Sequence, residues 1–147
     1  MASEVAKAYK HIVAIVRQMP EYDTLIPGGI HRQIAPPSAS YPHLVMAYAT
    51  GTDVQGFSGG FVGSGMDMLV KVVDKSSSAE TAQGAFDAVE SALLARNGEN
   101  VTIRPGVDVG AFVTLDRLSP FDLPVVENDV IFQQVGRMFR VFVDNVE

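Results

Sequence analysis

The beginning of the chain predicts an amphipathic helix from Glu4 to Met19. Its apolar residues recur at steps of three and four, which places them on one face of a helix: Val5, Tyr9, Ile12, Val16 and Met19. Ser3 is expected to cap this helix, and Pro20 is expected to end it. The helix therefore has one side to bury.

A second helix is expected after the sequence Ser77-Ser-Ala-Glu80. A hydroxyl followed three residues later by a carboxylate has the spacing of a capping box, in which each side chain bonds a free backbone amide. An apolar stripe follows, formed by Ala82, Ala85, Phe86, Val89, Ala92 and Leu93. Asn97-Gly98 supplies the left-handed stop at its end.

Segments rich in β-branched and aromatic residues predict the strands. A short extended piece is expected at 30–34, and longer strands are expected at 43–50, 66–74, 109–118 and 130–143. The element order is then α-β-β-β-α-β-β. Two one-sided helices need a common surface, so the predicted fold is α+β, a mostly antiparallel sheet of about four longer strands with both helices packed on one face.

Two loops contain apolar residues that are costly to leave in water. The glycine-rich segment 51–65, expected to be an extended loop or hairpin, contains Phe57, Phe61 and Val62. A proline-rich loop expected at Ser119–Pro124 contains Phe121 and Leu123. These side chains either fold back on their own domain or insert into an adjacent copy of the chain.

The last strand has large apolar groups on both of its faces. Alternation places Phe139, Val141 and Val143 on one face, and Met138 and Phe142 on the other. A two-layer domain hides only one face of its sheet, so either a neighbouring subunit covers the second face or the strand twists between two environments.

Two arginines belong to the same strand. Arg137 and Arg140 either pair across an interface with carboxylates of the acidic 119–129 segment, or pair with solvent and local carboxylates.

Composition narrows the class of protein. A chain of 147 residues, 47% apolar and 19% charged, with no linker between apolar blocks, predicts a single domain spanning 1–147. The net charge of −6 argues against a protein that binds nucleic acid through its phosphates. All of the excess negative charge lies in residues 61–147. With no cysteine, thiolate metal sites and cysteine nucleophiles are excluded. No apolar run reaches the ~20 residues that span a bilayer, so a soluble protein made in the cytoplasm is expected.

The patterns of known catalytic and cofactor sites are missing from the sequence. The glycine-rich segment lacks the Gly-Lys-Ser/Thr of a phosphate loop, and a strand rather than a helix follows Gly63-Ser-Gly65. No serine lies in a Gly-x-Ser-x-Gly elbow. His11, His31 and His43 lack metal-site spacing, and the acidic residues near 122–129 lack that of a calcium loop. We therefore expect no catalytic, cofactor or metal residues.

Taken in order, several segments resemble the tail-terminator (tail-completion) family of long-tailed bacteriophages. They are the first helix closing at Met19, Leu25-Ile-Pro-Gly-Gly-Ile-His, Ala35-Pro-Pro-Ser-Ala-Ser-Tyr-Pro-His-Leu-Val-Met, Val70-Lys-Val-Val-Asp-Lys-Ser-Ser-Ser, Ala85-Phe-Asp-Ala-Val-Glu-Ser-Ala-Leu-Leu and Gly136-Arg-Met-Phe-Arg-Val-Phe-Val. The similarity spans nearly the whole chain, and the order of the segments carries it. The glycine-rich segment and 119–127 are longer than the family pattern.

The resemblance implies a structural virion protein of the neck, not an enzyme. Such a protein forms a homohexameric ring, stops growth of the tail tube, and contacts the tail tube protein and a head-closure protein, while DNA passes through the lumen without specific binding. Candidate interface residues are Phe57, Phe61, Val62, Phe121, Leu123, Arg137, Phe139, Arg140 and Phe142. The alternatives are another neck component, such as a head-closure or head–tail adaptor protein, or a small α+β hydrolase or ligand-binding domain with a site built from Ser, Asp and His31 or His43.

Overall fold

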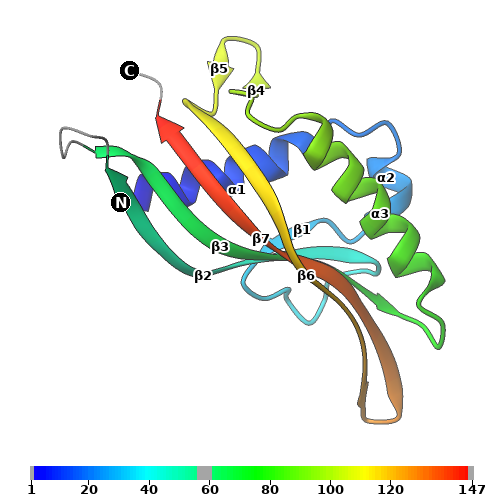
Figure 1. The fold of residues 1–147 in the computed structure, drawn as a ribbon. Helices are drawn as coiled ribbons and strands as arrows, with labels where there is room; N and C mark the ends of the chain where they lie inside the picture. Colours follow the sequence, from blue (N-terminus) through cyan, green and yellow to red (C-terminus); the bar gives the residue numbers. More distant parts are fainter. Residues whose placement is uncertain (1, 56–60, 146–147) are drawn as a thin grey trace.

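The computed structural model describes the backbone of residues 2–55 and 61–145, and the side chains of residues 4–49 and 65–144. The fold is α+β, with a mostly antiparallel sheet and helices on one of its faces, as the sequence predicts (Figure 1). The main sheet has five strands in the order β1-β2-β3-β7-β6. The strands are β1 (Ile30–Arg32), β2 (His43–Gln55), β3 (Phe61–Lys75), β6 (Ala111–Glu127) and β7 (Val130–Asn145).

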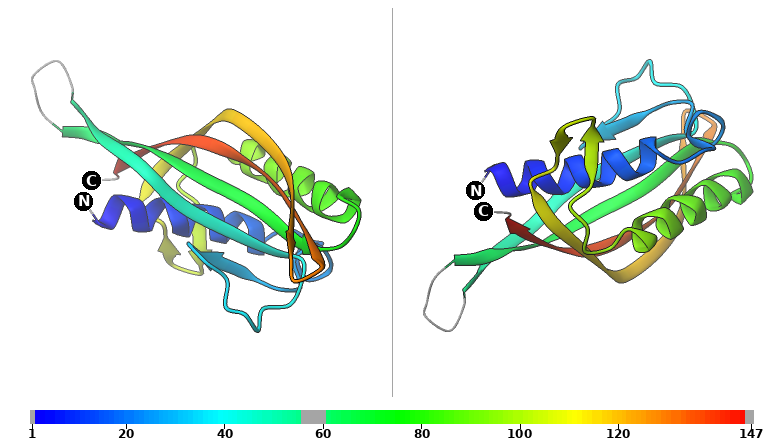
Figure 2. Two further views of the ribbon diagram at one scale, coloured as in Figure 1. Left: turned by 90° about the horizontal axis from the view of Figure 1, so that it is seen from below. Right: turned by 90° about the horizontal axis from the view of Figure 1, so that it is seen from above.

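The two long helices lie side by side across one face of the sheet, as Figure 2 shows from above. They are α1 (Ala2–Arg17) and α3 (Glu80–Ala95), and a short α2 (Tyr22–Leu25) follows α1. Alternate residues of the strands turn toward the helices and are buried among them, for example Met68, Val70 and Phe139. The predicted stripes of both helices enter this core.

The ends of the helices differ from the sequence prediction. Helix α1 begins at Ala2, so Ser3 lies inside the helix rather than capping it; alanine is the strongest helix former. Helix α3 begins at Glu80 after an Ala79 cap that makes no side-chain bond, so the predicted capping box is wrong. The Ser78 hydroxyl instead accepts a hydrogen bond from the Glu80 amide at 3.3 Å. The left-handed stop at Gly98 is confirmed by its φ of 78°.

The glycine-rich segment, expected to be a loop or a hairpin, and the proline-rich segment, expected to be a loop, both continue the sheet. Strands β2 and β3 extend into the glycine-rich segment, where Gly51 pairs with Met66 and Val54 with Gly63; residues 56–60 lie outside the described part. Backbone pairing needs no side chains, so glycine there does not break the ladder.

The proline-rich segment 119–124 is likewise part of β6, paired with β7 apart from an irregularity between Arg117 and Pro120. Pro120 and Pro124 are tolerated because β6 is the edge strand of the sheet.

The structure contains a small β-hairpin that was not predicted from the sequence. Strands β4 (Thr102–Arg104) and β5 (Val107–Asp108) pair with each other and lie against α1. The side chain of Gln18, just after α1, donates a hydrogen bond to the Thr102 carbonyl at 2.8 Å. The dipeptide Pro105-Gly106, with Gly106 at a φ of 79°, makes the turn and is the local signal that points to it.

Candidate subunit-interaction surfaces

The sheet face turned away from the helices carries a mixture of apolar and charged side chains. Leu69, Met138 and Phe142 are half-buried there, and Phe112 is 47% exposed. Arg140 and Asp67 form an ion pair across β3 and β7 at 3.0 Å. The Lys71 ammonium group donates a hydrogen bond to the side-chain oxygen Oε1 of Gln134 at 2.6 Å, and burial lowers the pKa of Lys71. Apolar side chains beside paired charges on this face are typical of a surface that contacts another protein.

Loop residues between β1 and β2 cover one end of that face. Tyr41 packs its ring against those of His43 and Phe132, with centroids 4.9 and 5.8 Å away. A hollow of about 230 Å³ lies beneath the loop, and His43 and Lys71 are in its lining.

The two neighbouring histidines bond to the backbone. A ring nitrogen of His31 contacts the Gly28 carbonyl at 2.9 Å, and one of His43 contacts the Ser40 carbonyl at 3.0 Å. Burial lowers the pKa of His43, although its bond to Ser40 opposes that shift. Within the described side chains, neither histidine is bonded to a serine hydroxyl or a carboxylate. The arrangement expected of a hydrolase is not assembled around them.

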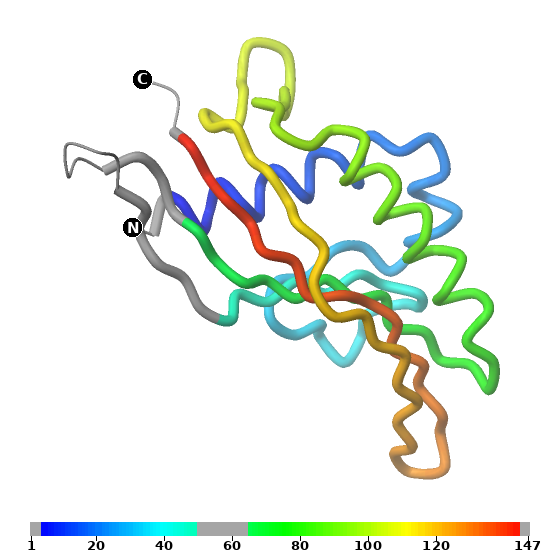
Figure 3. The backbone as a smooth tube through the Cα atoms, in the orientation of Figure 1, coloured from blue at the N-terminus to red at the C-terminus, as the bar shows by residue number. Residues whose placement is uncertain are grey.

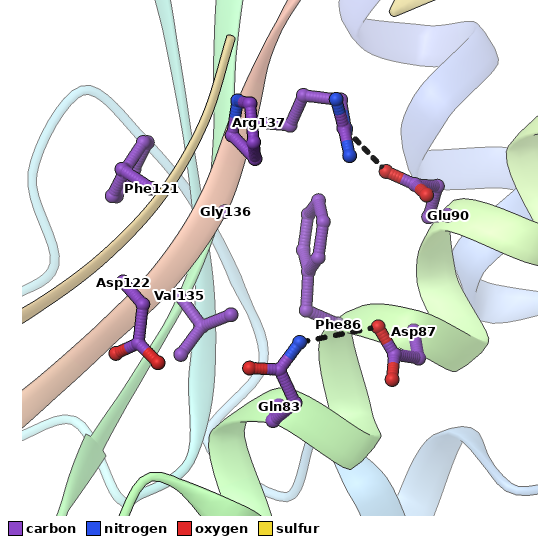
Figure 4. A pocket seen from close by; sticks show the side chains of 10 residues that line it. Gln83, Phe86, Asp87, Glu90, Phe121, Asp122, Val135, Gly136 and Arg137 are labelled. Carbon is purple, nitrogen blue, oxygen red and sulfur yellow. Dashed lines mark hydrogen bonds and ion pairs between the residues drawn. The ribbon is translucent and has the colours of Figure 1, made fainter.

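A pocket of about 290 Å³ separates α3 from the β6–β7 ladder (Figure 4). On its wall Arg137 donates to Glu90 at 2.6 Å and also to the Leu118 carbonyl at 2.7 Å. Arg117 approaches the other oxygen of Glu90 at 3.6 Å. Two arginines from β6 and β7 therefore converge on one carboxylate of α3. This cluster fixes the ladder to the helix.

Beyond that cluster the β6–β7 hairpin projects past the helices, as the backbone trace in Figure 3 shows. Its turn is Asn128–Asp129, both at positive φ, which is the two-residue turn that suits the twist of a hairpin. Near the tip Leu123, Val126 and Ile131 are 53%, 68% and 37% exposed. Exposed aliphatic side chains grouped on a projecting element indicate a contact surface.

A basic groove of about 350 Å³ lies between α1 and the β4–β5 hairpin. Its lining combines apolar side chains with four cations: Lys10, Arg17, Arg32 and Arg104. This groove was not predicted from the sequence, although Lys10, Val13, Ala14 and Arg17 are spaced to share one face of a helix.

The structure corrects part of the predicted interface set. Phe139 is fully buried between sheet and helices, so it belongs to the core and is unavailable to a neighbouring subunit. Of the two alternatives for the arginines, the structure has the local one: Arg137 pairs with Glu90 of α3, and Arg140 pairs with Asp67, its register partner on β3. Phe142 lies on the helix-free face.

The remaining candidates come from two segments. Phe121 and Leu123 lie on β6, Phe121 half-buried beside the pocket and Leu123 exposed. Phe57 lies outside the described residues, and Phe61 and Val62 are described only as backbone of β3.

Comparison with solved structures finds the same fold in a virus-like particle. A chain in the structure "Virion of native gene transfer agent (GTA) particle" superposes with a TM-score of 0.65. The two chains are 18% identical, and the match covers 91% of this chain and 92% of that one. No protein-family model matches the chain, and no curated protein sequence does either.

Among the described residues, no three histidine or carboxylate side chains gather as metal ligands would. In the same part of the chain, no helix has the length and apolar character needed to cross a membrane.

Proposed function

We propose that this chain is a structural virion protein that forms a hexameric ring at the top of a phage-type tail, stops growth of the tail tube and joins the tail to the head. The observation that carries the proposal is the fold shared with a chain of the gene transfer agent virion over nearly the whole of both chains. The sequence resemblance to tail terminators supports the more specific position in the neck.

The surfaces of the protomer fit a ring. Closure by rotation requires two different patches that complement each other, because each subunit contacts its neighbour head to tail. The chain offers apolar residues on a helix-free sheet face, on a projecting hairpin and in a basic groove. These surfaces differ in shape and charge, as such an association needs.

The charge balance fits a conduit for DNA. A wall that neutralised many phosphates would hold DNA, whereas one with little positive excess lets it pass. The net charge of −6 provides no such excess. In the proposed role the ring contacts the tail tube protein below and a head-closure protein above, and the lumen binds no particular DNA sequence.

Removing the gene from the particle-producing genome tests the proposal. Without a terminator, tail tubes grow to variable and excessive length and do not join heads, which electron microscopy of a lysate measures directly. Complementation with the wild-type gene restores uniform tails and serves as the control. Tails of normal length that fail to join heads indicate instead a head-closure or adaptor protein, and unchanged particles overturn the proposal.

A further inference from the structure

The basic groove between α1 and the β4–β5 hairpin is unusual in this acidic chain. Lys10, Arg17, Arg32 and Arg104 line it, and no carboxylate is in its lining. Within the part of the chain that the structure describes, no ion pair engages these four side chains. Four other arginines, Arg96, Arg117, Arg137 and Arg140, are all ion-paired.

The groove is also lined by apolar side chains. Val13 and Ala14 come from α1, and Ile103 and Val107 come from the β4–β5 hairpin; Ile103 is 36% exposed. A groove that combines aliphatic and cationic side chains fits a protein segment that combines aliphatic side chains with carboxylates.

The tip of the β6–β7 hairpin has that composition. Leu123, Val126 and Ile131 are exposed, and Asp122, Glu127 and Asp129 are exposed beside them. The sequence contains no lysine or arginine between Arg117 and Arg137. All charged residues of the tip are therefore acidic, and aliphatic side chains lie beside them, which complements the groove.

The tip of the β6–β7 hairpin and the β4–β5 hairpin, which lines the groove, lie at opposite ends of the protomer (Figure 1). The hairpin is held in place by the Arg137–Glu90 ion pair at its base, so it does not fold back onto its own groove. A contact between them has to join two copies of the chain. It is heterologous, since one copy supplies the hairpin and the next supplies the groove.

We propose that the acidic tip of the β6–β7 hairpin of one copy docks into the basic α1/β4–β5 groove of the next copy. This inference rests on the proposed ring and names the contact that builds it. The outer edge of β6 carries Pro120 and Pro124, which lack amide donors, so docking relies on side chains rather than on added strand pairing.

Disulfide trapping tests the contact, and the absence of native cysteine gives a clean background. A Val126→Cys protein is mixed with an Ile103→Cys protein under mild oxidation, and the mixed disulfide dimer is quantified on a non-reducing gel. The matched control replaces Val126→Cys by Ile34→Cys, a position in the β1–β2 loop, outside the β6–β7 hairpin, that is 81% exposed. The trapped pair should form about tenfold faster than the control pair and should slow as salt rises.

Charge reversal provides the second arm. Arg17→Glu with Arg104→Glu in the groove protein should reduce trapping to the control rate, as should Asp122→Lys with Glu127→Lys in the hairpin protein. Combining both reversed proteins should restore it, because the charges again complement each other. Lys75→Glu, a reversal outside the groove, should leave the rate unchanged. Circular dichroism of each variant verifies folding.

The outcomes separate this inference from the proposed function. The hairpin–groove contact is overturned if the mixed disulfide forms no faster than with the Ile34→Cys control. It is also overturned if neither charge reversal changes the rate of disulfide formation. If tails still lengthen when the gene is removed, the proposed function stands and the ring is built through another surface. Unchanged particles overturn the function whatever the trapping result.

Discussion

Arg137 of β7 and Glu90 of α3 meet at 2.6 Å although they are 47 residues apart in the chain. Both side chains are about four-fifths buried, at 19% and 17% exposure. The ion pair joins the sheet to the helix layer at the point where the hairpin leaves the body, so it determines where the hairpin points.

Arg137→Ala should therefore weaken the protomer. Removing one partner leaves the other charge partly buried and unpaired, and we expect a loss of about 2 kcal/mol in the free energy of unfolding. Urea denaturation measures it. Arg140→Ala is the matched control, because the Arg140–Asp67 pair is exposed on the arginine side, and it should leave the midpoint nearly unchanged. Equal losses in both variants would contradict this account of Arg137.

Gly136 should not accept a side chain. A Cβ there would overlap the Val70 carbonyl oxygen and lie 2.6 Å from the Cβ of Lys71, so Gly136→Ala pushes β7 away from β3. We expect a loss of about 2 kcal/mol in thermal or chemical denaturation. Gly84→Ala in α3 is the opposite case, since nothing lies within 4 Å, and should add about 0.5–1 kcal/mol. A stable Gly136→Ala protein would show that the two strands are less closely packed than described.

His11 makes the protomer sensitive to acid. Its ring is fully buried in α1, and neither nitrogen has a hydrogen-bond partner among the described residues. Burial, assisted by Arg96, lowers its pKa from 6.5 to about 4, against an opposing effect of Glu99. Between these pH values His11 is protonated in the unfolded chain but neutral in the folded chain. The free energy of unfolding therefore falls as the pH falls from 6.5 to about 4.

His11→Leu should remove that dependence. The wild type should lose about 3 kcal/mol more than the variant across this window, measured as unfolding free energy by urea titration at each pH. At neutral pH the variant should be at least as stable as the wild type, because two unsatisfied buried nitrogens disappear. Parallel pH profiles for the two proteins would mean that His11 is not the titrating group.

The two faces of β7 should respond differently to substitution. Phe139 is 0% exposed in the core, so Phe139→Ala should cost about 3–5 kcal/mol. Phe142 is half-buried on the helix-free face, and Phe142→Ser should change stability by less than about 1 kcal/mol. If another subunit covers that face, sedimentation will show weaker self-association for Phe142→Ser. A stable variant with unaltered self-association would remove this face from the assembly.

The periodic part of the fold could be predicted from the sequence. Steps of three and four placed Tyr9, Ile12 and Val16 on the buried side of α1, and alternation placed Met68 and Val70 on the buried side of β3. These patterns are local consequences of helix and strand geometry, so no knowledge of the rest of the molecule was needed.

Local signals failed where the partner strand decides the structure. Proline at 119–124 indicated a loop, and glycine at 51–65 left a loop and a hairpin both open, yet β6 pairs with β7 and β2 pairs with β3 in these segments. The same limit applies to the surfaces. Arg104 joins Lys10 in one groove only because the β4–β5 hairpin folds over α1, and sequence spacing alone does not place them together.

Cryo-electron microscopy of particles that contain this chain tests the central claim most directly. The account predicts a hexameric ring of this protein between the end of the tail tube and the head, with DNA or an open channel on its axis. Density for the chain in the head shell, along the length of the tube, or as an isolated copy without ring symmetry would contradict it.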